Sequence, residues 1–233
     1  MSSYAKQTLD VSLAGYYERS RLARVSDTTS NFSLTSNAGW RGELTIDKYF
    51  TNWWVLSLAG NYASHNYEGS AARIINDPQP SLAGGEGGFK FVFGDFRFYM
   101  LYNYQPLIIL VDEAVYIHDL KQVGMGSGIL GFEFSAISRY WDLAFEAKGG
   151  MGLSEVDYEG TAVKHQYMVE GAAMIIFGRT NKTLFEVISL KNIIGNDSLF
   201  GLKVSVREDS YSFGDDKYTL TNFRAGGFLK FIF

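Results

Sequence analysis

The sequence contains no cysteine, only three prolines and three histidines, and no apolar run long enough for a membrane helix. Without cysteine the chain forms no disulfides and performs no thiolate chemistry. A membrane helix needs about 20 consecutive apolar residues, and polar or charged residues interrupt every such stretch of this chain. The formal net charge of −4 at pH 7 provides no basic surface, so we expect no nucleic-acid partner.

Aromatic residues and glycine, by contrast, are abundant. The chain has 18 Phe, 15 Tyr and 25 Gly among 233 residues, and its aromatic content is 16%. Strands favour aromatic side chains, and glycine suits close strand contacts and tight turns, so the composition indicates an all-β fold. The length suits a single domain, which we expect to span residues 1–233.

The end of the chain, residues 221–233, alternates between apolar and polar side chains. One face carries Phe223, Ala225, Gly227, Leu229, Phe231 and Phe233. The other face carries Asn222, Arg224, Gly226 and Lys230, with Phe228 and Ile232 as exceptions. Side chains alternate between the two faces of a strand, so this pattern predicts one long strand with an apolar side and a polar side.

This strand resembles the last strand of bacterial outer-membrane β-barrels, whose assembly machinery recognises a final Phe and alternate apolar positions before it. The resemblance implies that Phe223, Leu229, Phe231 and Phe233 form the assembly signal. It also implies a Gram-negative outer-membrane location, with membrane lipid and the barrel assembly machinery as partners. The start, Met1-Ser-Ser-Tyr4, lacks the basic and apolar segments of an export signal, so we expect a mature-form sequence with an added start.

The same two-residue period recurs along the chain and predicts a transmembrane antiparallel up-and-down β-barrel of about ten strands. Two segments fit the period less well, Pro106–Asp112 and Thr183–Gly195, and if both are strands the number becomes twelve. We expect short periplasmic turns at Asp47–Asn52, Gly94–Asp95, Ser135–Tyr140 and Gly178–Lys182. We expect long extracellular loops at Ser20–Asn31, Glu68–Gly84, Gln105–Lys121 and Glu208–Lys217.

Aromatic residues cluster beside the short turns, where a girdle would lie at the lipid headgroups. They are Tyr49, Phe50, Trp53, Trp54, Tyr140 and Trp141.

The polar faces of the predicted strands carry charges of both signs, which we expect to face the lumen. They are Arg41, Glu43, Lys90, Arg97, Glu133, Glu146, Lys148, Lys164, Glu170, Lys203, Arg207, Arg224 and Lys230. Side chains largely fill a barrel of about ten strands, whereas an open aqueous channel needs about sixteen. We therefore favour a lumen filled by ion pairs, because buried charges must be paired. A narrow pathway for small solutes is the alternative.

One segment is apolar on both faces, although its position indicates a water-facing loop. It consists of Leu107, Ile108, Ile109, Leu110 and Val111. An exposed apolar patch of this kind is a liability unless something covers it. We consider three explanations: the segment folds into the barrel mouth as a plug, it forms an additional strand, or it contacts lipid or another subunit. The last explanation would make the protein a homo-oligomer.

The three histidines give little support for catalysis. His65 lies on a polar face near the long loops, His118 lies in the third long loop, and His165 lies on an apolar face. No cluster of histidines and carboxylates has the spacing of a metal site, and the glycine-rich stretch Gly84–Gly88 opens a strand rather than a phosphate-binding helix. We therefore expect no catalytic residue, no metal and no cofactor.

Our favoured hypothesis is a non-enzymatic integral outer-membrane barrel that serves as an envelope scaffold or as a narrow porin-like channel for small solutes. One alternative is an outer-membrane barrel enzyme that acts on lipid or peptide at the outer rim, with His65 or His118 as general base. A second alternative is a soluble β-barrel that binds a hydrophobic ligand.

Overall fold

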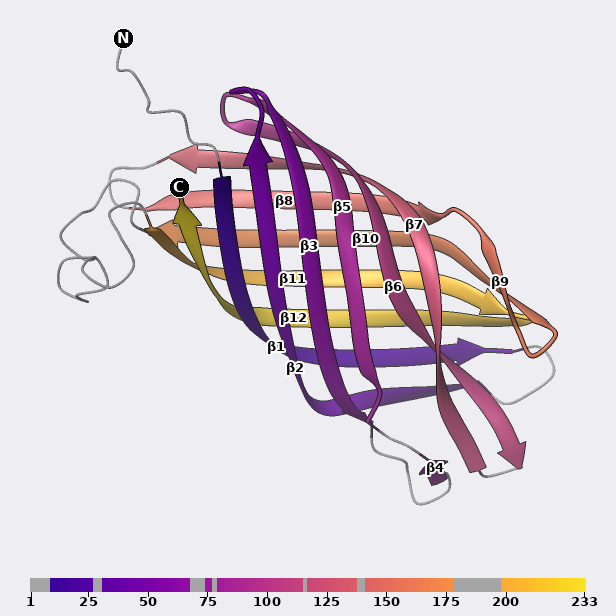
Figure 1. Cartoon of the computed structure of the whole chain (residues 1–233). Helices are drawn as coiled ribbons and strands as arrows, with labels where there is room; N and C mark the ends of the chain where they lie inside the picture. Colours follow the sequence, from indigo (N-terminus) through magenta and orange to yellow (C-terminus); the bar gives the residue numbers. More distant parts are fainter. Residues whose placement is uncertain are drawn as a thin grey trace, which may run out of the picture.

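The computed structural model describes residues 9–26, 31–67, 74–76, 79–114, 117–137, 141–177 and 198–233. Within these residues the regular elements are all β-strands, and no helix is long and apolar enough to cross a membrane. The chain folds into a tilted barrel in which strands on the near and far walls cross in projection (Figure 1).

Ten of the strands in the described residues form a closed antiparallel ring. In ring order they are β1 (Leu9–Val25), β2 (Phe32–Tyr49), β3 (Trp54–Tyr67), β5 (Ser81–Phe93), β6 (Phe96–Ala114), β7 (Ile117–Ile137), β8 (Asp142–Gly152), β10 (Thr161–Phe177), β11 (Ser198–Phe213) and β12 (Asp216–Ile232). The pairing of β12 with β1 closes the ring. The predicted antiparallel up-and-down barrel is thus confirmed, with ten strands in its wall.

Two short strands bring the sheet to twelve strands without widening the ring. β9 (Glu155–Tyr158) continues β8 along the same edge of β10, which it pairs at Thr161–Lys164. β4 (Ile74–Asn76) runs parallel to the first residues of β7. Neither short strand is one of the two segments considered as additional strands from the sequence. Of those segments, Pro106–Asp112 is part of β6 and Thr183–Gly195 lies outside the described residues.

The two chain ends of the described barrel meet at one rim. The Leu9 amide donates to the Phe233 carbonyl and the Phe233 amide donates to the Leu9 carbonyl, at 3.3 and 2.8 Å. The turn at Gly94–Asp95 lies at the same rim, which we call the short-turn rim. The opposite end is called the hairpin rim; β4 and the tips of β6 and β7 lie there (Figure 1).

At the hairpin rim, two of the expected long loops are instead extended hairpins. β6 and β7 remain paired through Ala114↔Ile117, and β11 and β12 remain paired through Phe213↔Asp216. The second hairpin needs only the tight turn Gly214–Asp215, and Gly214 supplies its positive φ of 57°. The predicted loops at Gln105–Lys121 and Glu208–Lys217 are therefore wrong, because the paired strands continue almost to the tips of both hairpins.

The outer face of the wall is apolar. Leu130, Trp40 and Tyr17 are 67%, 55% and 55% exposed. Of the aromatic residues expected beside the short turns, Phe50, Trp53 and Trp141 are also exposed, and Trp54 stacks on Phe50 with ring centroids 4.8 Å apart. Tyr49 is different: its hydroxyl donates to Asp10 Oδ2 inside the barrel at 3.0 Å. Tyr140 and the turn at Gly178–Lys182 lie outside the described residues.

The expected assembly-signal residues share the outer face of β12. Phe223 and Phe233 are exposed, and Leu229 and Phe231 are partly exposed. The inner face of the same strand carries Arg224 and Lys230, so the alternation read in the sequence places apolar side chains outside and cations inside.

The seam between β12 and β1 depends on a close backbone approach at Gly226. A Cβ atom built there would lie 2.7 Å from the Tyr16 Cα and would collide with the Gly15 carbonyl, whereas a Cβ on Gly15 itself would meet nothing within 4 Å. We predict that Gly226→Ala lowers the free energy of unfolding by about 1–3 kcal/mol, because the strands must separate to admit the methyl group.

The matched control is Gly15→Ala, which should change stability by no more than about 0.5 kcal/mol. Urea titration of the folded protein in lipid vesicles measures both values. Equal stability of the two variants would contradict the close approach at the seam.

Candidate functional site

The hairpin of β6 and β7 leaves the wall and folds across the mouth of the barrel at the hairpin rim. β6 pairs with β5 only as far as Tyr104, and β7 pairs with β8 only from Ser127 onward. Between these limits the two strands pair with each other, and β4 adds a short parallel pairing to the first residues of β7. We call this part, residues 105–114 and 117–126, the plug hairpin.

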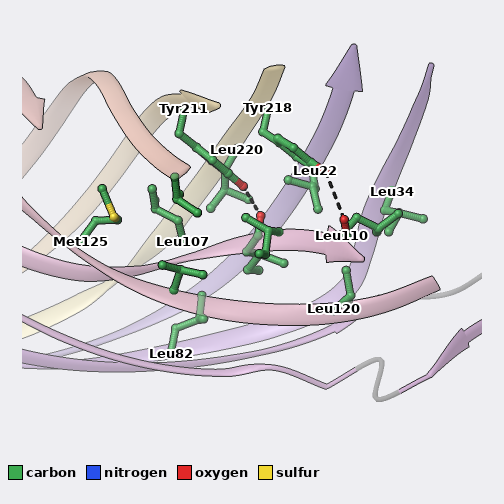
Figure 2. Packing of buried hydrophobic residues seen from close by; sticks show 14 of the residues in the cluster. Leu22, Leu34, Leu82, Leu107, Leu110, Leu120, Met125, Tyr211, Tyr218 and Leu220 are labelled. Carbon is green, nitrogen blue, oxygen red and sulfur yellow. Dashed lines mark hydrogen bonds between the residues drawn. The ribbon is translucent and has the colours of Figure 1, made fainter. Parts of the chain in front are cut away.

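The plug hairpin carries an apolar cluster inside the mouth. Leu107, Ile108, Ile109 and Leu110 are at most 2% exposed. They pack against Leu22, Leu34, Leu82, Leu220 and other side chains that come from much of the surrounding wall (Figure 2). A strand that is buried on both faces needs a continuous apolar run, which accounts for the Leu-Ile-Ile-Leu sequence.

Two tyrosines of the facing wall hold the free edge of the plug hairpin. Tyr211 at the end of β11 donates its hydroxyl to the Ile108 carbonyl, and Tyr218 on β12 donates to the Leu110 carbonyl at 3.3 Å (Figure 2). Their rings stack with centroids 5.4 Å apart. Buried carbonyls on an unpaired strand edge need donors, and the two hydroxyls supply them.

Pro106 lies where β6 leaves its neighbour β5. In an antiparallel pair, alternate residues direct their N–H and C=O groups to the same side. Pro106 has the same parity as Ile108 and Leu110, whose carbonyls face the tyrosines rather than β7. Its missing N–H therefore falls on the edge without a strand partner, where proline is tolerated.

The structure overturns two of the three explanations offered for this segment. Leu107, Ile108, Ile109, Leu110 and Val111 were considered as a lipid or subunit contact, but they face the interior of the barrel mouth, and Val111 is only partly exposed against the same cluster. The segment is also part of β6 rather than an additional strand.

Below the plug, the inner face of the barrel is charged. The residues expected to face the lumen that lie on this face are Arg41, Glu43, Lys90, Arg97, Glu133, Glu146, Lys148, Glu170, Lys203, Arg207, Arg224 and Lys230. Lys164 does not: its side chain is 53% exposed and pairs with Glu155.

A β-bulge explains the position of Lys164. His165 pairs with Tyr211 and Tyr167 pairs with the next residue back, Ser210, so Gln166 is an extra residue on β10. One extra residue reverses which side chains face inward. Before the bulge, His165 faces inward and Lys164 outward, the reverse of the sequence-based assignment.

The charged side chains form two layers, an upper one next to the plug hairpin and a lower one nearer the short-turn rim. The upper layer is centred on Glu18, which is 1% exposed. Its carboxylate faces Arg41 Nη1 at 3.8 Å, Arg224 Nε at 3.5 Å and His65 Nε2 at 3.4 Å. Arg224 also reaches Glu170 at 3.4 Å, and Arg207 forms a two-point contact with Asp209 at 2.9 and 3.0 Å. Four neighbouring strands, β12, β1, β2 and β3, thus share one carboxylate.

The lower charged layer connects strands that are not neighbours in the ring. Glu146 on β8 accepts Lys148 and Lys203, both at 2.9 Å. Lys148 also reaches Glu86 on β5 at 3.4 Å, a contact that spans the lumen because β6 and β7 lie between these strands in the ring. Nearer the short-turn rim, Lys90 pairs with Asp47 and Arg97 pairs with Glu133.

These side chains leave a lumen cavity of about 170 Å³ toward the short-turn rim. Its lining is mixed in charge and includes Glu43, Glu86, Lys148 and Lys203, with an apolar corner at Phe228. The Arg97 side chain at its lower end is 26% exposed, whereas Glu18 and His65 above it are each 1% exposed. The interior is therefore wettest at the short-turn rim and sealed toward the mouth.

A cluster around His165 lies directly below the plug. Ser127 Oγ is 2.8 Å from His165 Nδ1, and His165 Nε2 is 3.3 Å from Asp209 Oδ1. A serine, a histidine and a carboxylate in contact form the constellation used in nucleophilic catalysis. Here Ser127 is 1% and Asp209 0% exposed, and Arg207 already engages both oxygens of Asp209.

Sequence reasoning missed Glu18, Ser127 and Asp209 as members of the inner network. Residues two apart on a strand share a face, and this rule could have found two of them. Glu18 lies two residues from the inward Ser20, and Asp209 lies two residues from the inward Arg207. The Ser127–His165 contact depends on the bulge at Gln166, which has no clear sequence signal. The side chain of His118, a candidate general base, is not among those described, although its backbone pairs with Asp112.

Within the described part of the chain, no three His, Asp or Glu side chains are grouped so that they could hold a metal ion. The acidic side chains of the lumen face lysine and arginine instead, which makes the network an ion-pair lattice.

Comparison with known proteins gives structural likeness only. No protein-family model matches the chain, and no curated protein matches it. The outer membrane protease OmpT from Escherichia coli superposes with a TM-score of 0.54 at 9% identity, covering 100% of this chain and 99% of OmpT. The translocator domain of the autotransporter NalP from Neisseria meningitidis gives 0.49 at 9% identity, covering 99% and 90%.

An outer membrane channel from Pseudomonas putida F1 gives a TM-score of 0.47 at 9% identity, covering 99% of this chain and 97% of the channel. A protease and a channel are thus both among the similar structures. The likeness to OmpT shows that the chain has the fold of an outer-membrane β-barrel, and it leaves the activity open.

The charged layer yields a stability prediction. Glu18→Gln removes the carboxylate that faces Arg41, Arg224 and His65, so buried cations lose their counter-charge. We expect a loss of about 3–5 kcal/mol in the free energy of unfolding. The matched control is Glu155→Gln, whose partner Lys164 is exposed, and which should have little effect. Similar losses in the two variants would contradict the layer's structural role.

Proposed function

We propose that this protein is a non-enzymatic integral outer-membrane barrel whose lumen is closed in its resting form, and that it acts as an envelope scaffold rather than an open porin. The observation that carries the proposal is the plug hairpin, whose Leu107–Leu110 segment fills the mouth and is at most 2% exposed. Membrane lipid and the barrel assembly machinery are the partners that this proposal requires.

The membrane location is supported by the outward face. Large apolar side chains, including Leu130, Trp40 and Phe98, are about half exposed or more, and most charged side chains of the wall are turned inward. A face of this kind is stable against acyl chains and would aggregate in water. This argues against the soluble ligand-binding barrel, whose apolar side would face the interior.

Two barriers in series support a closed lumen. The apolar cluster fills the mouth, and the ion pairs around Glu18 and Arg224 seal the level below it. Small solutes entering at the short-turn rim reach only a cavity of about 170 Å³. A conducting form would have to displace both barriers, which makes the narrow channel the less favoured hypothesis.

The barrel enzyme receives some support from the Ser127–His165–Asp209 contacts and from the protease among the similar structures. However, a substrate at the outer rim would meet the plug before it reached Ser127, which is buried. We therefore assign these three residues a structural role. Self-association through Leu107–Val111 is likewise not proposed, because that segment is buried inside the mouth.

Planar-bilayer recording tests the closed state. We expect the purified protein to insert without stepwise current, because two layers of side chains block the lumen. An open porin reconstituted in the same bilayers serves as the positive control. Stable, reproducible conductance steps from the wild-type protein would refute the scaffold proposal in favour of a channel.

A parallel measurement separates scaffold from enzyme. The variants Ser127→Ala, His165→Ala and His65→Ala are assayed with wild type for hydrolysis of phospholipid and of casein in detergent. We expect the wild type to hydrolyse neither substrate and the variants to match it. Wild-type hydrolysis that the Ser127 or His165 variant abolishes would establish the enzyme alternative.

A further inference from the structure

A groove runs along the outer face of the barrel, on the side of β1, β10, β11 and β12. Its volume is about 980 Å³. Small residues, Gly171, Ala173 and Ala225, line it, and larger apolar side chains such as Tyr17 and Phe223 stand beside them. Ligand sites commonly have volumes of about 300–1,000 Å³, so the groove is large enough for part of a lipid.

A register break shapes this part of the wall. Glu18 pairs with Gly39 and Arg21 pairs with Thr35, so two residues of β1 lie opposite three residues of β2. Such irregularities bend and twist strands locally. Both strands turn sharply in the lower part of Figure 1, and the outward side chains of Ser33 and Thr35, near the start of β2, reach the groove.

Two arginines lie at one end of the groove. Arg19 and Arg21 both line it, and both are exposed on the outer face of β1. Neither is paired with a carboxylate in the part of the chain that the structure describes. The other arginines of the described strands, such as Arg41, Arg207 and Arg224, instead face inward and are paired with carboxylates. Two adjacent outward guanidinium groups without a protein partner are free to bind an anion from outside the protein.

The height of these arginines matches the outer headgroup region. Tyr17 pairs with Trp40, and the Trp40 ring lies 5.3 Å from that of Tyr62, so the three form part of an exposed aromatic belt. Such belts mark the membrane–water interface. On a strand tilted by about 40°, Arg19 and Arg21 lie about 5 and 10 Å beyond Tyr17 along the membrane normal. They therefore reach the level of the lipid phosphates while the groove extends below them.

We propose that the groove binds one phosphate-bearing lipid of the outer leaflet, with its phosphate on Arg19 and Arg21 and an acyl chain along Gly171, Ala173 and Ala225. Guanidinium groups match phosphate oxygens in charge and in their paired hydrogen-bond geometry. The small residues leave the backbone accessible, so a chain lies close to the wall. The site rests on the proposed membrane location. It would anchor the barrel to one class of lipid, the phosphate-bearing lipids of the outer leaflet.

Native mass spectrometry of the protein in detergent micelles tests this site. The probe is bis-phosphorylated, hexa-acylated lipid A, compared with the same lipid after removal of both phosphates and with inorganic phosphate. We expect the phosphorylated lipid to bind at least about tenfold more tightly than the dephosphorylated lipid. Inorganic phosphate, lacking the acyl chain, should not displace it.

Variants of the protein distinguish the contribution of the lipid phosphate to binding from that of the acyl chain. Arg19→Ala/Arg21→Ala should weaken binding by at least about tenfold. The control Lys48→Ala/Lys217→Ala removes the same charge from exposed positions outside the groove and should bind as wild type. Gly171→Phe should also weaken binding, because a side chain there meets no protein atom within 4 Å of its Cβ and projects into the groove.

Heat-modifiable gel migration verifies that each variant is folded before binding is measured. Undiminished binding by the arginine variant or by Gly171→Phe would overturn the proposal, as would equal binding of the dephosphorylated lipid. These outcomes are independent of conductance: a protein that conducts but shows the expected lipid selectivity would refute the scaffold function and leave this site standing.

Discussion

The closed ring of hydrogen-bonded strands, apolar outside and charged inside, is the constraint from which the rest of the structure follows. A sheet in lipid must satisfy every backbone group internally, and only closure removes its edges. The pairing of Leu9 with Phe233 completes that closure. Because alternate residues then face opposite environments, most charged residues of the wall are directed into a narrow interior with little water. There they require partners, and the layers around Glu18 and Glu146 provide them.

The interior has a polar region toward one rim and an apolar region toward the other. Toward the short-turn rim, ion pairs such as Lys90–Asp47 surround a small polar cavity. Toward the hairpin rim, an apolar cluster around Ile108 and Ile109 resembles the core of a soluble domain enclosed by strands. The plug hairpin makes this possible because it brings its own paired backbone into the mouth. Tyr211 and Tyr218 then satisfy the carbonyls on its free edge.

The barrel could be predicted from the sequence because the alternation of apolar and polar residues can be read within each strand alone. Alternation along residues 221–233 gives the two faces of β12 directly, and repetition of that period gives the ring. The inward position of Arg224 and Lys230 follows from the same parity. Parity fails where the register shifts: the extra residue Gln166 exchanges the faces of Lys164 and His165.

Other features required information that lies far apart in the chain. The burial of Leu107–Leu110 depends on Tyr211 and Tyr218, which are more than a hundred residues away. Neither hydropathy nor period distinguishes a plug from an exposed patch, so three explanations were open. The groove beside Arg19 was not predictable either, because it arises from five strands and from a register break between β1 and β2.

The orientation of the outer face is tested most directly by fluorescence quenching with brominated lipids. Single-tryptophan variants retain Trp40, Trp53 or Trp141, all of which are exposed on the barrel exterior. After reconstitution, we predict that lipids with bromine on the acyl chains or headgroups quench each of the three and that aqueous iodide quenches them weakly. Strong quenching by iodide with no effect of brominated lipid would contradict the account, because it would place these rings in water.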